Sequence, residues 1–223
     1  MINIVNIEEN KREFLDLLNS VNREGMKNII EWLENKSDFF TAPASSRFHG
    51  NYPGGLCEHS LNVYKAAIHM RDHVMALSHK YSENIDTVCP DESVIIAALL
   101  HDVCKVNLYD KELKLFKDDN APIGSQWKHY ESYVINDKFP MGHGEKSVFM
   151  IQQLGLKLTG QEVLAIRHHM GIWDVANVLS DYLKHAYNQT MNTVPLAILI
   201  ALSDAFASYT MEECIDPKKY PVD

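Results

Sequence analysis

The chain has 223 residues, 46% of them hydrophobic, which is enough for a full hydrophobic core and predicts one main domain. Its 30 acidic and 21 basic side chains give a net charge of -9, which argues against a surface that binds long nucleic acids. The cysteines lie far apart without a CxxC pair, so neither a disulfide framework nor a zinc ribbon is indicated. No apolar run is long enough to span a bilayer, and we expect a cytoplasmic protein without a membrane partner.

The N-terminal part predicts helices followed by an irregular segment. Apolar residues at helical spacing predict two short helices, at about residues 14–21 and 26–33, within an N-terminal helical extension of residues 1–38. Residues 39–55 are too rich in Pro, Gly and Ser for regular structure, and a long helix is expected at 56–77. His59 lies near the start of that helix.

The rest of the chain predicts an all-α domain with one β insertion. Asp91 is expected to cap a buried helix that runs to Leu100 and on to Lys105. In residues 106–140, aromatic and charged residues alternate with a period closer to two than to 3.6, which predicts a loop with a small β-hairpin. Further helices are expected at residues 144–154, 160–169, 175–187 and 195–211. The main domain would then cover 39–211, with a C-terminal tail of 212–223.

The stretch "AALLHDVCK" places His101 and Asp102 directly after an uninterrupted apolar run. A buried carboxylate is costly unless a cation or a hydrogen-bond network compensates it. Adjacent helical residues diverge by about 100°, so both side chains can reach one ion at the helix end. His59 lies on or beside an apolar stripe, and Asp204 lies in an apolar helix with no basic residue nearby in sequence.

Two imidazoles and two carboxylates of this kind are a typical ligand set for a divalent metal ion. An ion-paired core, in which Lys105 or Arg167 neutralises Asp102 and Asp204, explains the same residues. On residue types alone both interpretations remain open.

Two more stretches, "GHGEKS" and "AIRHHMG", place histidines at predicted helix ends beside glycines that permit close approach, and they could serve a second metal. The remaining histidines, His49 among them, have polar neighbours and are expected at the surface or in loops.

The order His59, then His101-Asp102 with Lys105 in an HDxxK pattern, then Asp204 resembles the HD superfamily of metal-dependent phosphohydrolases. The motifs that carry the resemblance are "YPGGLCEHSLNV", "LLHDVCK" and "LSDAFAS". Their context is most similar to small stand-alone bacterial and phage HD proteins and to the catalytic domain of HD-type exoribonucleases. The resemblance implies an HD-domain helical bundle.

The resemblance also implies a ligand set. The first metal would be held by His59, His101, Asp102 and Asp204. Asp102 would bridge to a second metal held by His143 and His169, with His168 as the alternative to His169. The implied cofactors are divalent ions (Mn, Fe, Co, Ni or Mg), one or two per chain. Cys104 stands where the family usually has Gly.

For a hydrolase, the metals would activate a water for attack on phosphorus. Asp102 and Lys105 are the expected catalytic residues, and Lys105 and His143 the expected substrate-binding residues. Glu145 could support a ligating histidine, or it could be an exposed residue of a first helical turn. The expected substrate is a small phosphorylated molecule, a nucleotide phosphoester in particular.

The aromatic residues of the hairpin region, Trp127, Tyr130 and Tyr133, could stack on a base or simply pack the hairpin. Two other functions remain open: a di-iron oxygenase similar to the inositol-oxygenase branch, and a non-catalytic nucleotide-binding HD module. The sequence does not predict an oligomeric state.

Overall fold

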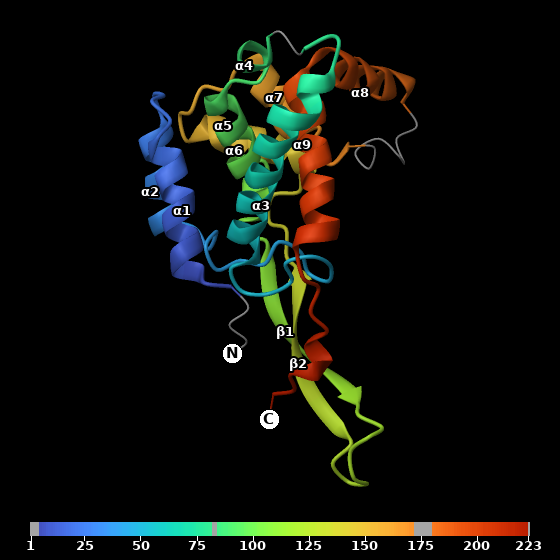
Figure 1. The fold of residues 1–223 in the computed structure, drawn as a ribbon. Helices are drawn as coiled ribbons and strands as arrows, with labels where there is room; N and C mark the ends of the chain where they lie inside the picture. Colours follow the sequence, from blue (N-terminus) through green and yellow to red (C-terminus); the bar gives the residue numbers. More distant parts are fainter. Residues whose placement is uncertain (1–4, 82–83, 172–179, 223) are drawn as a thin grey trace.

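The computed structural model describes residues 5–81, 84–171 and 180–222. A body of helices carries a two-stranded antiparallel hairpin that projects away from it (Figure 1). This arrangement confirms the predicted all-α bundle with a small β insertion. The elements are α1 Ile7–Asn19, α2 Met26–Asn35, α3 Gly55–His69, α4 Ile85–Val88, α5 Asp91–Leu100, β1 Tyr109–Lys117, β2 Trp127–Ile135, α6 His143–Gln153, α7 Gly160–Arg167, α8 Asp181–Thr193 and α9 Pro195–Phe206.

Helix α5 lies in the middle of the helical body. Every residue from Ser93 to Leu100 is buried. A helix that is apolar on all sides must be surrounded, and α5 packs against α1, α3, α7 and α9. The His-Asp pair that follows Leu100 is therefore delivered into the interior of the protein.

Several predicted helix boundaries need correction. Pro90 and not Asp91 is the N-cap of α5; Asp91 lies in the first turn and forms an ion pair with Arg71, a partner that local sequence does not reveal. The helix predicted for 56–77 is α3 followed by a π-helical turn, Met70–Val74, and a short 3-10 turn. The helix predicted for 175–187 falls partly on residues 172–179, outside the described residues.

The hairpin confirms the β structure expected within residues 106–140. Its register places Tyr109 opposite Ile135 and Lys117 opposite Trp127. The C-terminal segment runs along the other side of β2, where the backbone N–H of Val222 donates to the carbonyl of His129 at 2.9 Å. The base of the hairpin, at Tyr109 and Ile135, joins the helical body, and its tip extends away from the body (Figure 1).

The division into residues 1–38, 39–211 and 212–223 stays a prediction. Helix α1 packs against both α3 and α5, so the N-terminal extension contacts the helices of the main domain. In the described part of the chain, no single helix is both long and apolar enough to cross a membrane. One pair, Asp181–Thr193 with Pro195–Met211, passes that test jointly, with a bend of 99° between its parts.

Close contact between the backbones of α6 and α7 positions two of the predicted site histidines. A Cβ atom added at Gly144 would lie 2.2 Å from the carbonyl oxygen of Arg167. Because this neighbour is backbone, it cannot swing aside as a side chain could. Gly144 therefore permits the spacing that brings His143, at the start of α6, close to His169, just beyond α7.

We expect Gly144→Ala to destabilise the fold by roughly 1–3 kcal/mol, because the added methyl overpacks this helix contact. Denaturant unfolding measures the change. Gly160→Ala is the matched control: Gly160 begins α7 and a Cβ there meets nothing within 4 Å. Equal stability of the two variants would contradict the proposed role of the close approach.

Candidate metal centre

The predicted site residues come together at the C-terminal end of α5. His59 comes from α3, His101 and Asp102 follow α5, and His169 follows α7. These four side chains are buried, each with at most 1% of its surface exposed. His143, at the start of α6, and Asp204, in α9, complete the cluster from its more open side. Segments far apart in sequence thus supply one concentrated set of nitrogen and oxygen donors.

Asp102 divides the histidines into two groups. Its Oδ2 atom lies 3.4 Å from Nε2 of His59 and 3.4 Å from Nε2 of His101. Its Oδ1 atom lies 2.7 Å from Nε2 of His143 and 3.4 Å from Nε2 of His169. One carboxylate therefore faces a different pair of imidazoles with each of its oxygens.

The helix ends fix the tautomers of two histidines. Nδ1 of His101 donates to the carbonyl of Ala98 at 2.8 Å, and Nδ1 of His169 donates to the carbonyl of Ile166 at 2.6 Å. Both carbonyls belong to last helical turns, where no intrahelical partner is available. Because a carbonyl only accepts, each Nδ1 carries the proton and each Nε2 turns its lone pair toward the cluster.

Glu212 fixes the tautomer of His59, a role that the sequence did not predict. Nδ1 of His59 donates to Oε1 of Glu212 at 2.9 Å, and the Glu212 side chain is buried. Burial raises the pKa of Glu212, but His59, His49 and Asn62 together lower it more, so the net pKa lies below the ordinary value. The only sequence signal was its position eight residues, about two helical turns, beyond Asp204.

The converging lone pairs require a cation. Nε2 of His59 lies 3.1 Å from Nε2 of His101 and 3.3 Å from Oδ1 of Asp204. Nε2 of His169 is buried and makes no hydrogen bond within the described chain. Two facing imidazole lone pairs beside two carboxylates repel one another unless a proton or a metal ion lies among them. Imidazole and carboxylate donors suit a divalent transition metal, so the cluster can hold one.

Lys105 forms an ion pair inside this cluster. Its Nζ atom lies 2.6 Å from Oδ2 of Asp102. Burial raises the pKa of Asp102. Lys105, His101 and His143 together lower it by more than burial raises it, so the net pKa lies well below the ordinary value. The ion pair between Lys105 and Asp102, which the ion-paired core would contain, is thus present. It does not account for the four imidazoles, and Arg167 pairs with Glu145 at 2.5 Å instead of with either buried aspartate.

Cys104 packs against His143. Its Sγ atom lies 3.4 Å from Nδ1 of His143, and its backbone N–H donates to Oγ of Ser147 at 3.2 Å. Burial and the charge of Asp102 raise the pKa of the Cys104 thiol to about 12. The thiol is therefore protonated at neutral pH when no metal is bound. Its sulfur nevertheless lies close enough to Asp102 and His143 for the three to share a metal ion.

The two adjacent histidines point to different neighbours. His168 contacts Arg167, with Nδ1 2.8 Å from the guanidinium, and packs its ring against Tyr187. His169 faces Asp102. Glu145, which could have supported a ligating histidine, pairs with Arg167 and so connects α6 to α7.

His49 was expected at the surface or in a loop; it lies in a loop, but it is partly buried beside the cluster. Its ring centre lies 5.0 Å from that of His59, and its Nε2 lies 3.4 Å from Oγ of Ser208. Burial, His59 and Lys105 together lower the pKa of His49 to about 4. The polar neighbours of His49 in "SSRFHGN" gave no sign that this loop folds over the cluster.

The cluster opens into a pocket of about 640 Å³. Lys105, His49 and Tyr109 line it, together with Asp102, His143, His169 and Asp204. Tyr109 and Ile135, the first pair of the hairpin ladder, form part of its wall. Trp127, Tyr130 and Tyr133 do not line this pocket. Tyr130 packs against Phe116 and Tyr133 against Tyr109, which fits the alternative that these aromatics pack the hairpin.

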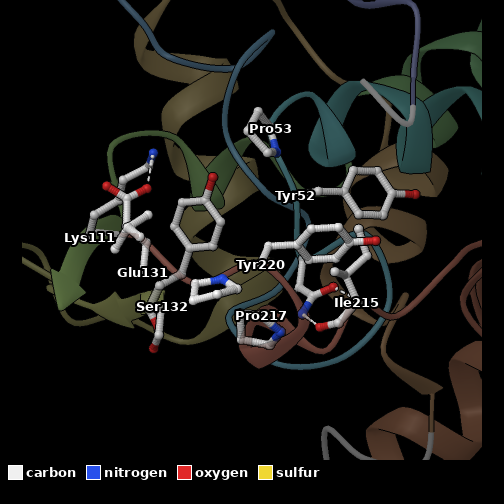
Figure 2. Close-up of a pocket in the computed structure, with 12 residues that line it drawn as sticks. Tyr52, Pro53, Lys111, Glu131, Ser132, Ile215, Pro217 and Tyr220 are labelled. Carbon is white, nitrogen blue, oxygen red and sulfur yellow. Dashed lines mark hydrogen bonds and ion pairs between the residues drawn. The ribbon is translucent and has the colours of Figure 1, made fainter. Parts of the chain in front are cut away.

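A second pocket, of about 440 Å³, contains none of the predicted site residues. Figure 2 shows Lys111 and Glu131 of the hairpin, joined by an ion pair, on one side of it and Tyr52 and Ile215 on the other. Its groups lack the convergent donors of the metal cluster. Candidate metal donors therefore line the larger pocket and not this one.

The comparisons with known proteins agree with this geometry. The family model "HD domain" matches residues 56–209, which include all six predicted metal ligands. The chain belongs to the HD-domain family. HD domains bind divalent metals, and the His-Asp cluster described above is the group of residues in this HD domain that can hold one.

One curated relative is the dihydroneopterin 2',3'-cyclic phosphate phosphodiesterase of Methanocaldococcus jannaschii. It is 33% identical to this HD domain protein over 121 residues, which cover 49% of the chain and 42% of the relative. The match thus spans less than half of the relative's length. No solved structure matches the chain.

We expect Glu212→Gln to weaken metal binding by roughly 10–100-fold, because the amide orients His59 less firmly and makes it a weaker donor. Competition with a fluorescent chelator measures the affinity directly. Glu213→Gln is the matched control, since the next residue is exposed. Unchanged affinity in Glu212→Gln would show that His59 does not depend on this carboxylate.

Proposed function

We propose that this protein is a metal-dependent phosphohydrolase that cleaves a phosphoester in a small, nucleotide-like substrate. The observation that carries the proposal is the convergence of four imidazoles on the two oxygens of one buried carboxylate, at the base of an open pocket. Family membership and the phosphodiesterase relative support the same reaction type.

In this proposal Asp102 belongs to two metal positions. His59 and His101 lie on the side of its Oδ2 atom, and Asp204 lies 3.3 Å from Nε2 of His59; these three are the candidate ligands of the first ion together with Asp102. His143 and His169 lie on the side of Oδ1 and are the candidates for a second ion. Both groups would share Asp102, as the family resemblance implies.

A bound divalent ion supplies a water whose pKa is lowered toward neutrality and thus a nucleophile. The chain supplies the rest. Lys105 is positive, because Asp102 and Tyr109 raise its pKa by more than burial lowers it. Its head lies in the wall of the pocket, where it can attract a phosphate oxygen. Glu212 keeps the donor nitrogen of His59 directed inward.

The shape of the pocket favours a small substrate. Its volume of about 640 Å³ is typical of a small-molecule site, and Lys105 is the single lysine or arginine among the described residues that line it. Phe48, Met170, Tyr109 and Tyr209 give it apolar and aromatic walls that suit a flat heterocycle. The relative acts on a 2',3'-cyclic phosphate of a pterin. We therefore extend the proposal to a phosphodiester, cyclic in particular, attached to a flat bicyclic ring.

The first test measures metal content and hydrolysis together. Purified protein is depleted with a chelator, reloaded with Mn²⁺, Co²⁺, Ni²⁺, Mg²⁺ or Fe²⁺, and assayed on 2',3'-cyclic nucleotides, dihydroneopterin 2',3'-cyclic phosphate and the matching phosphomonoesters. We expect activity only after reloading, and we expect it to be lost in Asp102→Asn. Asp86→Asn, an exposed carboxylate on α4, should behave as wild type.

Hydrolysis of cyclic diesters, with little attack on monoesters, supports the full proposal. Hydrolysis of monoesters alone rejects the diester and keeps the phosphohydrolase. Two tightly bound irons with oxygen consumption and no hydrolysis would reject the hydrolase in favour of an oxygenase. Substrate binding without turnover in the reloaded protein would reject catalysis altogether.

Lys105→Gln should lower kcat/KM by roughly 100-fold, because a positive charge facing the phosphate is removed. Lys105 also pairs with Asp102, so metal content is measured in the same samples. Normal metal content with reduced turnover assigns Lys105 to the substrate, whereas loss of metal would assign it to the support of Asp102. Lys111→Gln, on the hairpin surface, is the matched control.

A further inference from the structure

The outer edge of β1 is unpaired in a hairpin that projects from the body (Figure 1). Strand β2 has β1 on one side and the bridge to Val222 on the other. Strand β1 pairs with β2 alone within the part of the chain that the structure describes. A free strand edge carries a row of N–H and C=O groups that are ready to pair with another strand.

The ladder shows which residues of β1 direct their backbone groups outward. Asn136 N–H donates to the carbonyl of Leu108, and Asp118 N–H donates to the carbonyl of Gln126, both at 2.8 Å. In the observed register these are hydrogen-bonded pairs, and every second pair between them has the same pattern. The even-numbered residues of β1 therefore bond to β2. The odd-numbered residues, with Leu113 in the middle, present N–H and C=O groups to the free edge.

Two leucines lie exposed between the charged residues of β1. Leu113 is 61% exposed and Leu115 56%, and Trp127 on the same face is 64% exposed. A hairpin of only two strands is marginally stable in water. A further strand at this edge would cover part of these side chains and stabilise the hairpin.

We infer that the occupant of this edge is β1 of a second copy of this chain, paired antiparallel about a two-fold axis at Leu113. The two hairpins then form one four-stranded sheet. Full overlap of the two strands places Leu113 opposite Leu113 as a hydrogen-bonded pair. It places Glu112 of each copy opposite Lys114 of the other, so two complementary charge pairs form.

Neighbouring registers are disfavoured by charge. Residues whose N–H and C=O groups point to the free edge must lie opposite each other. The register can therefore shift only by steps that keep odd-numbered residues of one β1 opposite odd-numbered residues of the other. The next step in one direction places Glu112 opposite Glu112, although it also pairs Asp110 with Lys114. The next step in the other direction places Lys114 opposite Lys114 and Lys111 opposite Lys117. Like charges directly opposite each other destabilise a strand pair. Among these three registers, the one centred on Leu113 overlaps fully and has opposite-charge pairs without any like-charge pair.

The two charged residues remain available for such pairing. Within the hairpin, Glu112 lies opposite Ser132 and Lys114 opposite Tyr130, which are neutral. Their own contact along the strand is 3.7 Å long, with side chains 56% and 33% exposed. Among the described residues, neither charge thus has a strong partner.

Charge reversal tests the pairing. Sedimentation velocity of the full chain, over a range of concentrations, should show a monomer–dimer equilibrium. Glu112→Lys and Lys114→Glu should each weaken the dimer by roughly tenfold or more, because each creates two like-charge contacts. The double variant, E112K with K114E, should restore the wild-type dimer. The unfolding midpoint of each variant shows that the monomer is intact.

Leu113→Pro is a second, independent test. The N–H of Leu113 points away from β2, so proline removes no bond of the hairpin but blocks a strand at the outer edge. Leu113→Val keeps the N–H and should dimerise. A monomeric wild type would overturn the proposal. So would a dimer that is unaffected by the single reversals and by Leu113→Pro, or one that the double variant fails to restore.

Discussion

The arrangement of the helices depends on one costly feature, the burial of Asp102 at the end of an apolar helix. An ionised carboxylate in such a place requires compensation from several directions. Lys105 supplies one positive charge at 2.6 Å, and histidines from α3, α6 and α7 surround both oxygens. Each of these elements must lie where its imidazole can reach Asp102. The apolar packing around α5 and the polar cluster at its end therefore specify the same arrangement.

The helix ends orient the donors as well as deliver them. Ala98 and Ile166 would have unpaired carbonyls in last helical turns, and the Nδ1 protons of His101 and His169 satisfy them. The same two bonds leave Nε2 unprotonated and directed at Asp102. His59 lies near the start of α3, where the backbone carbonyls already accept hydrogen bonds within the helix. A carboxylate must therefore accept the Nδ1 proton of His59. Glu212 fills that role.

The sequence predicted those parts of the site that local pattern encodes. Seven apolar residues before His101 indicate burial, and burial beside Asp102 indicates a compensating cation. The hairpin follows from its period of two. Glu212 and His49 escaped prediction because their contact with His59 depends on how distant loops fold back: 153 residues separate Glu212 from His59. Asp91 illustrates the same limit, since its partner Arg71 comes from another helix and replaces the predicted cap.

The C-terminal segment connects the metal cluster to the hairpin. At one end Glu212 holds His59, and at the other Val222 pairs with β2 beside His129. The base of the same hairpin contributes Tyr109 to the wall of the pocket. Because an isolated hairpin is marginally stable, whatever pairs with its edges also determines how firmly that wall is held. The segment after α9 supports one edge, and in the proposed dimer β1 of the second copy supports the other. A change at the strand edge would then reach the pocket through Tyr109 and leave the donors around Asp102 in place.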